Sequence, residues 1–120
     1  MNKLAYSISA LIATVANAEE YQRFADAIGY YDANYTWEAV KVTTEDGFIL
    51  TTFHVTGKAS GPFTPSLPPV LIQHGDYGDG AEWMGGYGYD GFPDRLPMFL
   101  ALAEAGYDVW IGNNRGTDYS

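Results

Sequence analysis

Residues 69–75 read Pro69-Val70-Leu71-Ile72-Gln73-His74-Gly75. The stretch holds a short, wholly apolar run, Val70 to Ile72, bounded by proline before it and by His-Gly after it. Such a run predicts a strand that is buried on both faces of a parallel sheet. A parallel strand needs a crossover connection to its neighbour, so the fold class depends on the residues that follow.

A helix and a second strand follow. Apolar residues recur at helical spacing between residues 96 and 103, and Gly106 closes the pattern. They are Leu96, Phe99, Leu100, Leu102 and Ala103. Residues Tyr107 to Ile111 then predict a second buried strand. The sequence therefore predicts one parallel strand–helix–strand unit and an α/β fold with an incomplete sheet.

An antiparallel hairpin is predicted before this unit. Its strands are expected at Ala39 to Thr44 and at Phe48 to Thr56. The tight turn between them, Glu45-Asp46-Gly47, has glycine where a positive φ is required. After the hairpin, residues 57–69 are rich in glycine and proline, which predicts an irregular surface connection.

A short amphipathic helix is predicted over residues 20–28. Its apolar stripe consists of Tyr21, Phe24, Ala25 and Ile28. Gly29 is expected to end the helix, and residues 30–37 are expected to link it to the hairpin.

Residues 1–18 are predicted to be a cleaved secretory signal peptide. Lys3 supplies the positive start, Leu4 to Val15 the apolar run, and Ala16-Asn17-Ala18 the small-residue cleavage box. The apolar run is much shorter than the roughly 20 residues of a spanning helix, which disfavours a membrane anchor. We therefore expect a mature chain of residues 19–120, secreted or lysosomal. In a eukaryotic cell, Asn34 of Asn34-Tyr35-Thr36 is an expected N-glycosylation site.

The composition limits the class of protein. A chain of 120 residues provides one small domain, and a hydrophobic content of 47% provides its core. With 15 acidic and 6 basic residues, the formal net charge is −9, which argues against a nucleic-acid partner. The absence of cysteine excludes a disulfide scaffold and thiolate metal sites.

The first candidate site is Gln73-His74-Gly75-Asp76, at the C-terminal end of the first parallel strand. Open α/β sheets bind ligands at this edge. Gly75 permits a sharp turn, and such a turn can direct a backbone N–H into the crevice as an oxyanion donor. The alternative is that His74 only satisfies buried backbone groups at the end of the strand.

The second candidate site, residues 111–117, follows the second strand at the same edge. Its Gly and Asn residues suit a turn, and Arg115 is a candidate to brace the loops through charge-assisted hydrogen bonds. A phosphate-binding loop is disfavoured, because the motif G-x-x-x-x-G-K-[ST] is absent and the net charge is negative.

The long glycine-rich loop, residues 75–94, offers two further candidates. Its acidic residues are Asp76, Asp79, Glu82, Asp90 and Asp94. They carry oxygen ligands for a hard cation, but their spacing does not match a calcium loop, so we expect a solvated loop and no metal or other cofactor. The loop's aromatic residues either line an apolar substrate mouth or pack beneath the loop. They are Trp83, Tyr87, Tyr89 and Phe92.

The sequence offers no catalytic nucleophile. No G-x-S-x-G occurs, and neither of the two histidines, His54 and His74, neighbours a serine at a strand–helix turn.

Several motifs, in order and at similar spacing, resemble the acid lipase family of α/β-hydrolases, which includes the gastric and lysosomal acid lipases. The resemblance covers residues 35–120. The matching stretches are Val42–Leu50, Pro69–Gly75, Trp83 and Leu100–Gly116.

This resemblance implies an enzyme of lipid catabolism that hydrolyses carboxylic esters of triacylglycerols or sterols with a Ser-His-Asp triad. Its partners would be the lipid ester substrate and a peripheral lipid interface. Asp76 aligns with the family's first oxyanion donor, which acts through its backbone N–H. The family usually has an apolar residue there, and a carboxylate beside a developing oxyanion would repel it unless it points away or is protonated.

The resemblance reaches Ser120 before the nucleophile's position, so none of the triad is assigned within these residues. We therefore interpret residues 19–120 as the N-terminal part of an α/β-hydrolase lipase domain. The alternative is a non-catalytic secreted remnant that binds lipids or esters through the aromatic loop.

Overall fold

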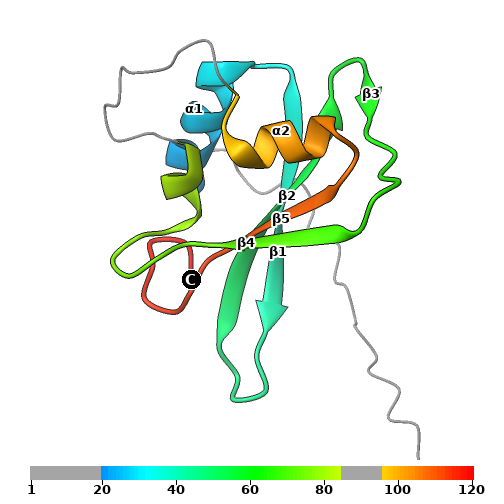
Figure 1. Cartoon of the computed structure of the whole chain (residues 1–120). Helices are drawn as coiled ribbons and strands as arrows, with labels where there is room; N and C mark the ends of the chain where they lie inside the picture. The colour runs from blue at the N-terminus through cyan, green and yellow to red at the C-terminus, as the bar shows by residue number, and fades with distance from the viewer. Residues whose placement is uncertain (1–19, 85–95) are drawn as a thin grey trace, which may run out of the picture.

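The computed structural model describes residues 20–84 and 96–120. The strand order in the sheet is β1-β2-β5-β4, with β3 paired to β2 (Figure 1). The elements are α1 (Gln22–Tyr31), β1 (Tyr35–Thr43), β2 (Ile49–Lys58), β3 (Gly61–Pro62), β4 (Pro69–Gln73), the 3₁₀ helix η1 (Gly80–Met84), α2 (Met98–Glu104) and β5 (Asp108–Gly112). None of the described helices is long and apolar enough to cross a membrane. The predicted α/β class, with a hairpin and one parallel pair, is confirmed.

The hairpin of β1 and β2 forms around the predicted turn. Thr43 pairs with Ile49, and Gly47 has φ +90°, a conformation that glycine adopts without steric cost. β1 begins at Tyr35 rather than at Ala39, so the predicted link over residues 30–37 is partly wrong. Tyr35 is buried and pairs with Lys58, which extends the strand towards its N-terminus.

Helix α1 buries its predicted stripe but does not end at Gly29. Phe24 and Ile28 are buried, whereas the helix runs on to Tyr31. Asp32 then turns to an extended conformation, and its carboxylate accepts the backbone N–H of Asn34 at 2.8 Å. This local hydrogen bond competes with the helical pattern, so the end of the helix is set by Asp32.

The parallel pair is β4 and β5, in a register that runs from Pro69 beside Asp108 to Gln73 beside Gly112. Helix α2 connects them, and Gly106 ends the turn after it with φ +100°, as predicted. β5 also pairs antiparallel with β2, which joins the parallel unit to the hairpin.

Two predictions for the apolar strand and the loop before it are wrong in part. Ile72 is buried, but Leu71 is 66% exposed. β4 is the last strand in the order, and both described α-helices lie on one side of the sheet, so only one face of β4 is covered (Figure 1). In the expected irregular stretch 57–69, Gly61 and Pro62 pair with the end of β2 as β3.

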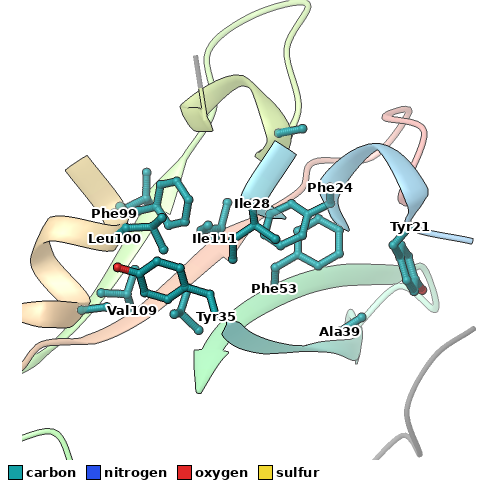
Figure 2. Close-up of a cluster of buried hydrophobic side chains, with 14 of the residues drawn as sticks. Tyr21, Phe24, Ile28, Tyr35, Ala39, Phe53, Phe99, Leu100, Val109 and Ile111 are labelled. Atoms are coloured by element: carbon teal, nitrogen blue, oxygen red, sulfur yellow. The ribbon is translucent and has the colours of Figure 1, made fainter. Parts of the chain in front are cut away.

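The core fills the space between the helices and one face of the sheet (Figure 2). Phe53 of β2 is at its centre. Its ring stacks on Phe24 with centroids 3.8 Å apart, and it meets the rings of Tyr21, Trp37 and Tyr119 edge-on at 5.5, 5.7 and 5.0 Å. Burial of these rings draws α1 onto the sheet, close to the carboxyl ends of β4 and β5.

Candidate functional site

The carboxyl ends of β4 and β5 lie at the same edge of the sheet, because the two strands are parallel. The segments that follow them enclose a groove of about 620 Å³. Residues 74–79 line one wall, residues 114–118 line the other, and Arg23 of α1 contributes from the side. The two candidate sites expected after the strands therefore share one groove.

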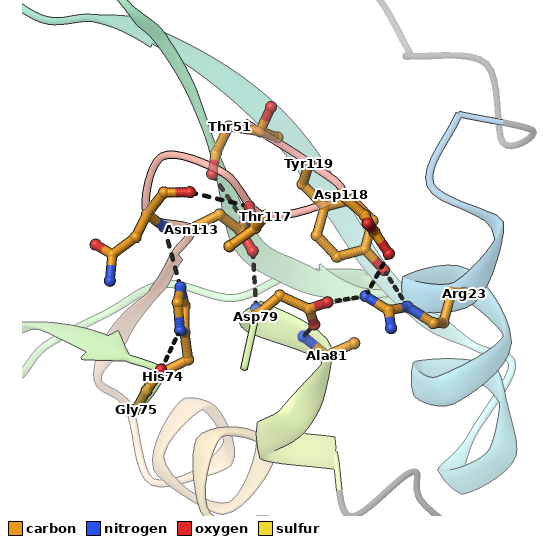
Figure 3. Close-up of polar contacts among 12 residues, drawn as sticks. Arg23, Thr51, His74, Gly75, Asp79, Ala81, Asn113, Thr117, Asp118 and Tyr119 are labelled. Atoms are coloured by element: carbon orange, nitrogen blue, oxygen red, sulfur yellow. Dashed lines mark hydrogen bonds and ion pairs between the residues drawn. The ribbon is translucent and has the colours of Figure 1, made fainter. Parts of the chain in front are cut away.

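His74 joins the two walls. It is buried, and its Nε2 accepts the backbone N–H of Asn114 at 3.0 Å (Figure 3). Its Nδ1 lies 2.7 Å from the carbonyl oxygen of Gly75. Since Nε2 accepts, the ring proton is on Nδ1 and is donated to Gly75. Both ring nitrogens are thus used to hold backbone groups at the start of the turn.

The turn after His74 has a conformation that is rare for its residue type. Tyr77 has φ +62° and its side chain is fully exposed. A non-glycine residue in this region is strained unless its surroundings hold it there. Asp76 precedes it, is exposed and lines the groove. The backbone N–H of Asp76 donates to no acceptor among residues 20–84 and 96–120.

The far end of the turn is held by a buried carboxylate. One oxygen of Asp79 accepts the backbone N–H of Ala81 at 2.8 Å, which starts η1. The other forms an ion pair with Arg23. Sequence reasoning assigned Asp79 only to the acidic loop and did not single out Arg23. No local signal pairs them, because α1 and η1 are brought together by the fold.

Asn113 holds Gly80, the residue that follows Asp79. Its Oδ1 accepts the backbone N–H of Gly80 at 2.7 Å, and its Nδ2 donates to the carbonyl oxygen of Thr51 at 2.8 Å. The side chain is buried between β2 and η1. The turn and Gly80 after it are therefore held by Asn113 and Asn114, which follow β5, and by Arg23 of α1.

Arg115 forms the charge-assisted contact expected of it. Its guanidinium donates to Asp46 at 2.7 Å and lies over the ring of Phe48, 4.0 Å from the centroid. The pKa of Asp46 is lowered by its hydrogen bonds from Thr44 and Arg115. This contact braces the loop after β5 against the hairpin.

The remaining candidates are not gathered in the groove. Trp83 is half-buried in η1, packs against the core and does not line the groove. Its Nε1 has no hydrogen-bond partner in the part of the chain that the structure describes. Tyr87, Tyr89, Phe92, Asp90, Asp94 and the predicted leader 1–18 lie outside the described residues.

No three acidic, histidine or cysteine side chains among the described residues form a group that fits a metal ion. Asn34 is exposed between α1 and β1, and its side-chain amide donates to Asp32 at 2.8 Å.

His54 does not line the groove. Its Nδ1 lies 2.9 Å from Glu38, its Nε2 lies 2.7 Å from Asp108, and its ring stacks on Trp110 at 3.9 Å. The ring thus links β1, β2 and β5. Together with the backbone contacts of His74, this leaves both ring nitrogens of both histidines engaged.

The sequence matches known proteins along most of its length. Lipase member K of Homo sapiens is 35% identical over 106 residues, covering 88% of this chain and 25% of that protein. Gastric triacylglycerol lipase of Bos taurus is 35% identical over 105 residues, covering 87% and 24%. A putative lysosomal acid lipase/cholesteryl ester hydrolase of Crotalus adamanteus is 38% identical over 87 residues, covering 72% and 20%.

The chain spans about a quarter of the length of the first two of these relatives. No solved structure matches it. A family model described as a partial alpha/beta-hydrolase lipase region matches residues 27–86, which include the hairpin, β4 and the turn after it. The predicted resemblance is thereby confirmed, and the chain belongs to the α/β-hydrolase lipases.

Proposed function

We propose that this chain is the N-terminal part of a secreted or lysosomal ester hydrolase that cleaves triacylglycerols or sterol esters. Its role is to supply the first strands of the sheet and one donor of the oxyanion hole, the backbone N–H of Asp76. The observation that supports the proposal is the turn 75–79, which is anchored at both ends and lies after the parallel strand β4, at the edge where open α/β sheets bind ligands.

The chemistry follows from charge. Attack on an ester carbonyl places negative charge on its oxygen, and a fixed N–H stabilises that charge without reorganisation at the moment of reaction. The N–H of Asp76 meets no acceptor among the described residues, so it is open to a ligand. The Asp76 side chain is exposed, so its carboxylate is free to remain in water.

The nucleophile and the general base are expected outside these 120 residues. The sequence holds no G-x-S-x-G. Neither His54 nor His74 has a ring nitrogen available to activate a serine.

The test is to express the full reading frame that contains this chain and to assay emulsified triolein, tributyrin and cholesteryl oleate, with and without a serine-directed phosphonate. We expect hydrolysis that the phosphonate abolishes. The isolated 120 residues are expected not to hydrolyse p-nitrophenyl butyrate. Fatty-acid binding by the full-length protein without hydrolysis of any ester would reject the enzyme and favour the non-catalytic lipid-binding function.

A further inference from the structure

We infer that Arg23 and Asp79 are positioning residues for the oxyanion donor, so that helix α1 controls the geometry of the catalytic turn. The inference rests on the proposed function, because it concerns the role of the Asp76 N–H. Arg23 is on α1 and Asp79 directly precedes η1, three residues after Asp76.

Asp79 needs this partner. Its side chain is only 8% exposed and its carboxylate is ion-paired with Arg23. A buried carboxylate is strongly unfavourable unless a cation and hydrogen bonds compensate for the lost water. Asp79 obtains the cation from α1 and a hydrogen bond from Ala81 N–H.

The guanidinium of Arg23 is itself held in place. Its Nε donates to the hydroxyl of Tyr119 at 3.2 Å, it lies 5.3 Å from the centroid of that ring, and Asp118 is 3.5 Å away (Figure 3). The ring of Tyr119 packs edge-on against Phe53 at 5.0 Å. Arg23 therefore connects Asp79 to the packed core through Tyr119.

The backbone strain at Tyr77 explains why the Arg23–Asp79 ion pair affects the position of the turn as well as the stability of the fold. Tyr77, with φ +62°, lies between His74 and Asp79. A residue with a side chain leaves this conformation unless both ends of the turn are fixed. If the Asp79 end is released, Tyr77 relaxes and the neighbouring N–H of Asp76 moves. A displacement of about 1 Å is enough to lower a catalytic rate about 100-fold.

The test compares Arg23→Gln, Asp79→Asn and the double variant in the full-length protein. Arg23→Gln leaves the Asp79 carboxylate buried without its cation, so we expect a lower Tm and a kcat about 10- to 100-fold lower, with KM within about twofold. The double variant removes the stranded charge, so its Tm should recover. Its kcat should stay low, because α1 no longer holds the turn.

The matched control is Lys58→Gln. Lys58 is a partly exposed cation, 31% against 41% for Arg23, and its ion pair with Glu104 of α2 lies outside the residues that line the groove. We expect its kcat to be unchanged. If kcat recovers with Tm in the double variant, or if Arg23→Gln lowers Tm alone, the pair is only structural and the inference is wrong.

A second measurement does not depend on activity. Amide hydrogen exchange of residues 75–79 should accelerate in Arg23→Gln relative to Lys58→Gln, and unchanged exchange would overturn the positioning role. Should the wild-type protein neither hydrolyse esters nor react with the phosphonate, the proposed function fails. Hydrogen exchange would then still decide whether Arg23 holds the turn.

Discussion

The backbone N–H of Asn114, in the loop after β5, donates to Nε2 of His74, at the end of β4, at 3.0 Å. The two residues are 40 positions apart in the sequence. This single bond sets the tautomer of His74, and the proton left on Nδ1 is donated to the carbonyl oxygen of Gly75. The imidazole of His74 therefore joins the two walls of the groove through backbone groups of Gly75 and Asn114.

Replacement of His74 tests this link. His74→Phe keeps an aromatic ring but leaves the N–H of Asn114 without its acceptor and the carbonyl of Gly75 with only the N–H of Gly78 at 3.4 Å. We expect a loss of about 2–3 kcal/mol in the free energy of unfolding, because partly buried polar groups lose their hydrogen bonds. Thermal unfolding of the full-length variants measures it. His74→Gln, which retains a donor and an acceptor, should lose less, and an equal loss would contradict the assigned hydrogen bonds.

The oxyanion role of Asp76 depends on the backbone, so only a change that removes the N–H should affect catalysis strongly. We expect Asp76→Pro to lower kcat about 100- to 1,000-fold, which is the usual effect of losing one oxyanion donor. Asp76→Leu keeps the N–H and removes the carboxylate, so its kcat should equal or exceed that of the wild type at neutral pH.

Steady-state kinetics with tributyrin distinguish the two Asp76 variants, with circular dichroism to verify folding. A similar loss in both would mean that the side chain, and not the N–H, carries the effect.

Asp108 predicts a pH dependence of stability. Burial alone would raise its pKa, but hydrogen bonds from the Trp110 indole and from His54 outweigh burial and lower the pKa below the ordinary value. A carboxyl group with a lowered pKa in the folded state stabilises the fold above its unfolded-state pKa. That stabilisation is lost as the pH falls through the folded-state pKa.

Asp108→Asn should therefore cost about 1 kcal/mol at pH 6, and the difference from the wild type should shrink as the pH falls below the ordinary pKa of an aspartate. Thermal melting at several pH values gives the comparison. Glu45→Gln, on the exposed turn of the hairpin, is the control. If the loss of stability in Asp108→Asn grew as the pH fell, the lowered pKa of Asp108 would be contradicted.

If the protein passes through the secretory pathway of a eukaryotic cell, the tripeptide Asn34-Tyr35-Thr36 predicts an N-linked glycan on Asn34. The residue is exposed at the turn before β1, so a glycan there meets no steric obstacle from the described core. On expression in animal cells we expect the full-length protein in the medium or in lysosomes, without residues 1–18. Treatment with an N-glycosidase should remove one glycan fewer from Asn34→Gln than from the wild type. An identical change in gel mobility of both proteins after this treatment would reject Asn34 as a glycosylation site.

The sequence determined the features that depend on neighbouring residues. Gly47 and Gly106 adopt positive φ where a turn requires it, and the apolar stripe of Phe24 and Ile28 is buried as its spacing predicted. The α/β class followed from the same local signals, because backbone conformation and hydrophobic period are encoded over a few residues. The assignment of the Asp76 N–H as oxyanion donor came from the resemblance to the acid lipases and stays a prediction.

Only the tertiary structure decided the features that depend on distant segments. The exposure of Leu71 depends on which strands and helices adjoin β4, and no property of the run Val70 to Ile72 records that. The pairing of Arg23 with Asp79 spans 56 residues and exists because Phe24 stacks on Phe53 and brings α1 beside η1. Such contacts arise from packing of the core, whereas the sequence pattern around each residue describes only its own helix or loop.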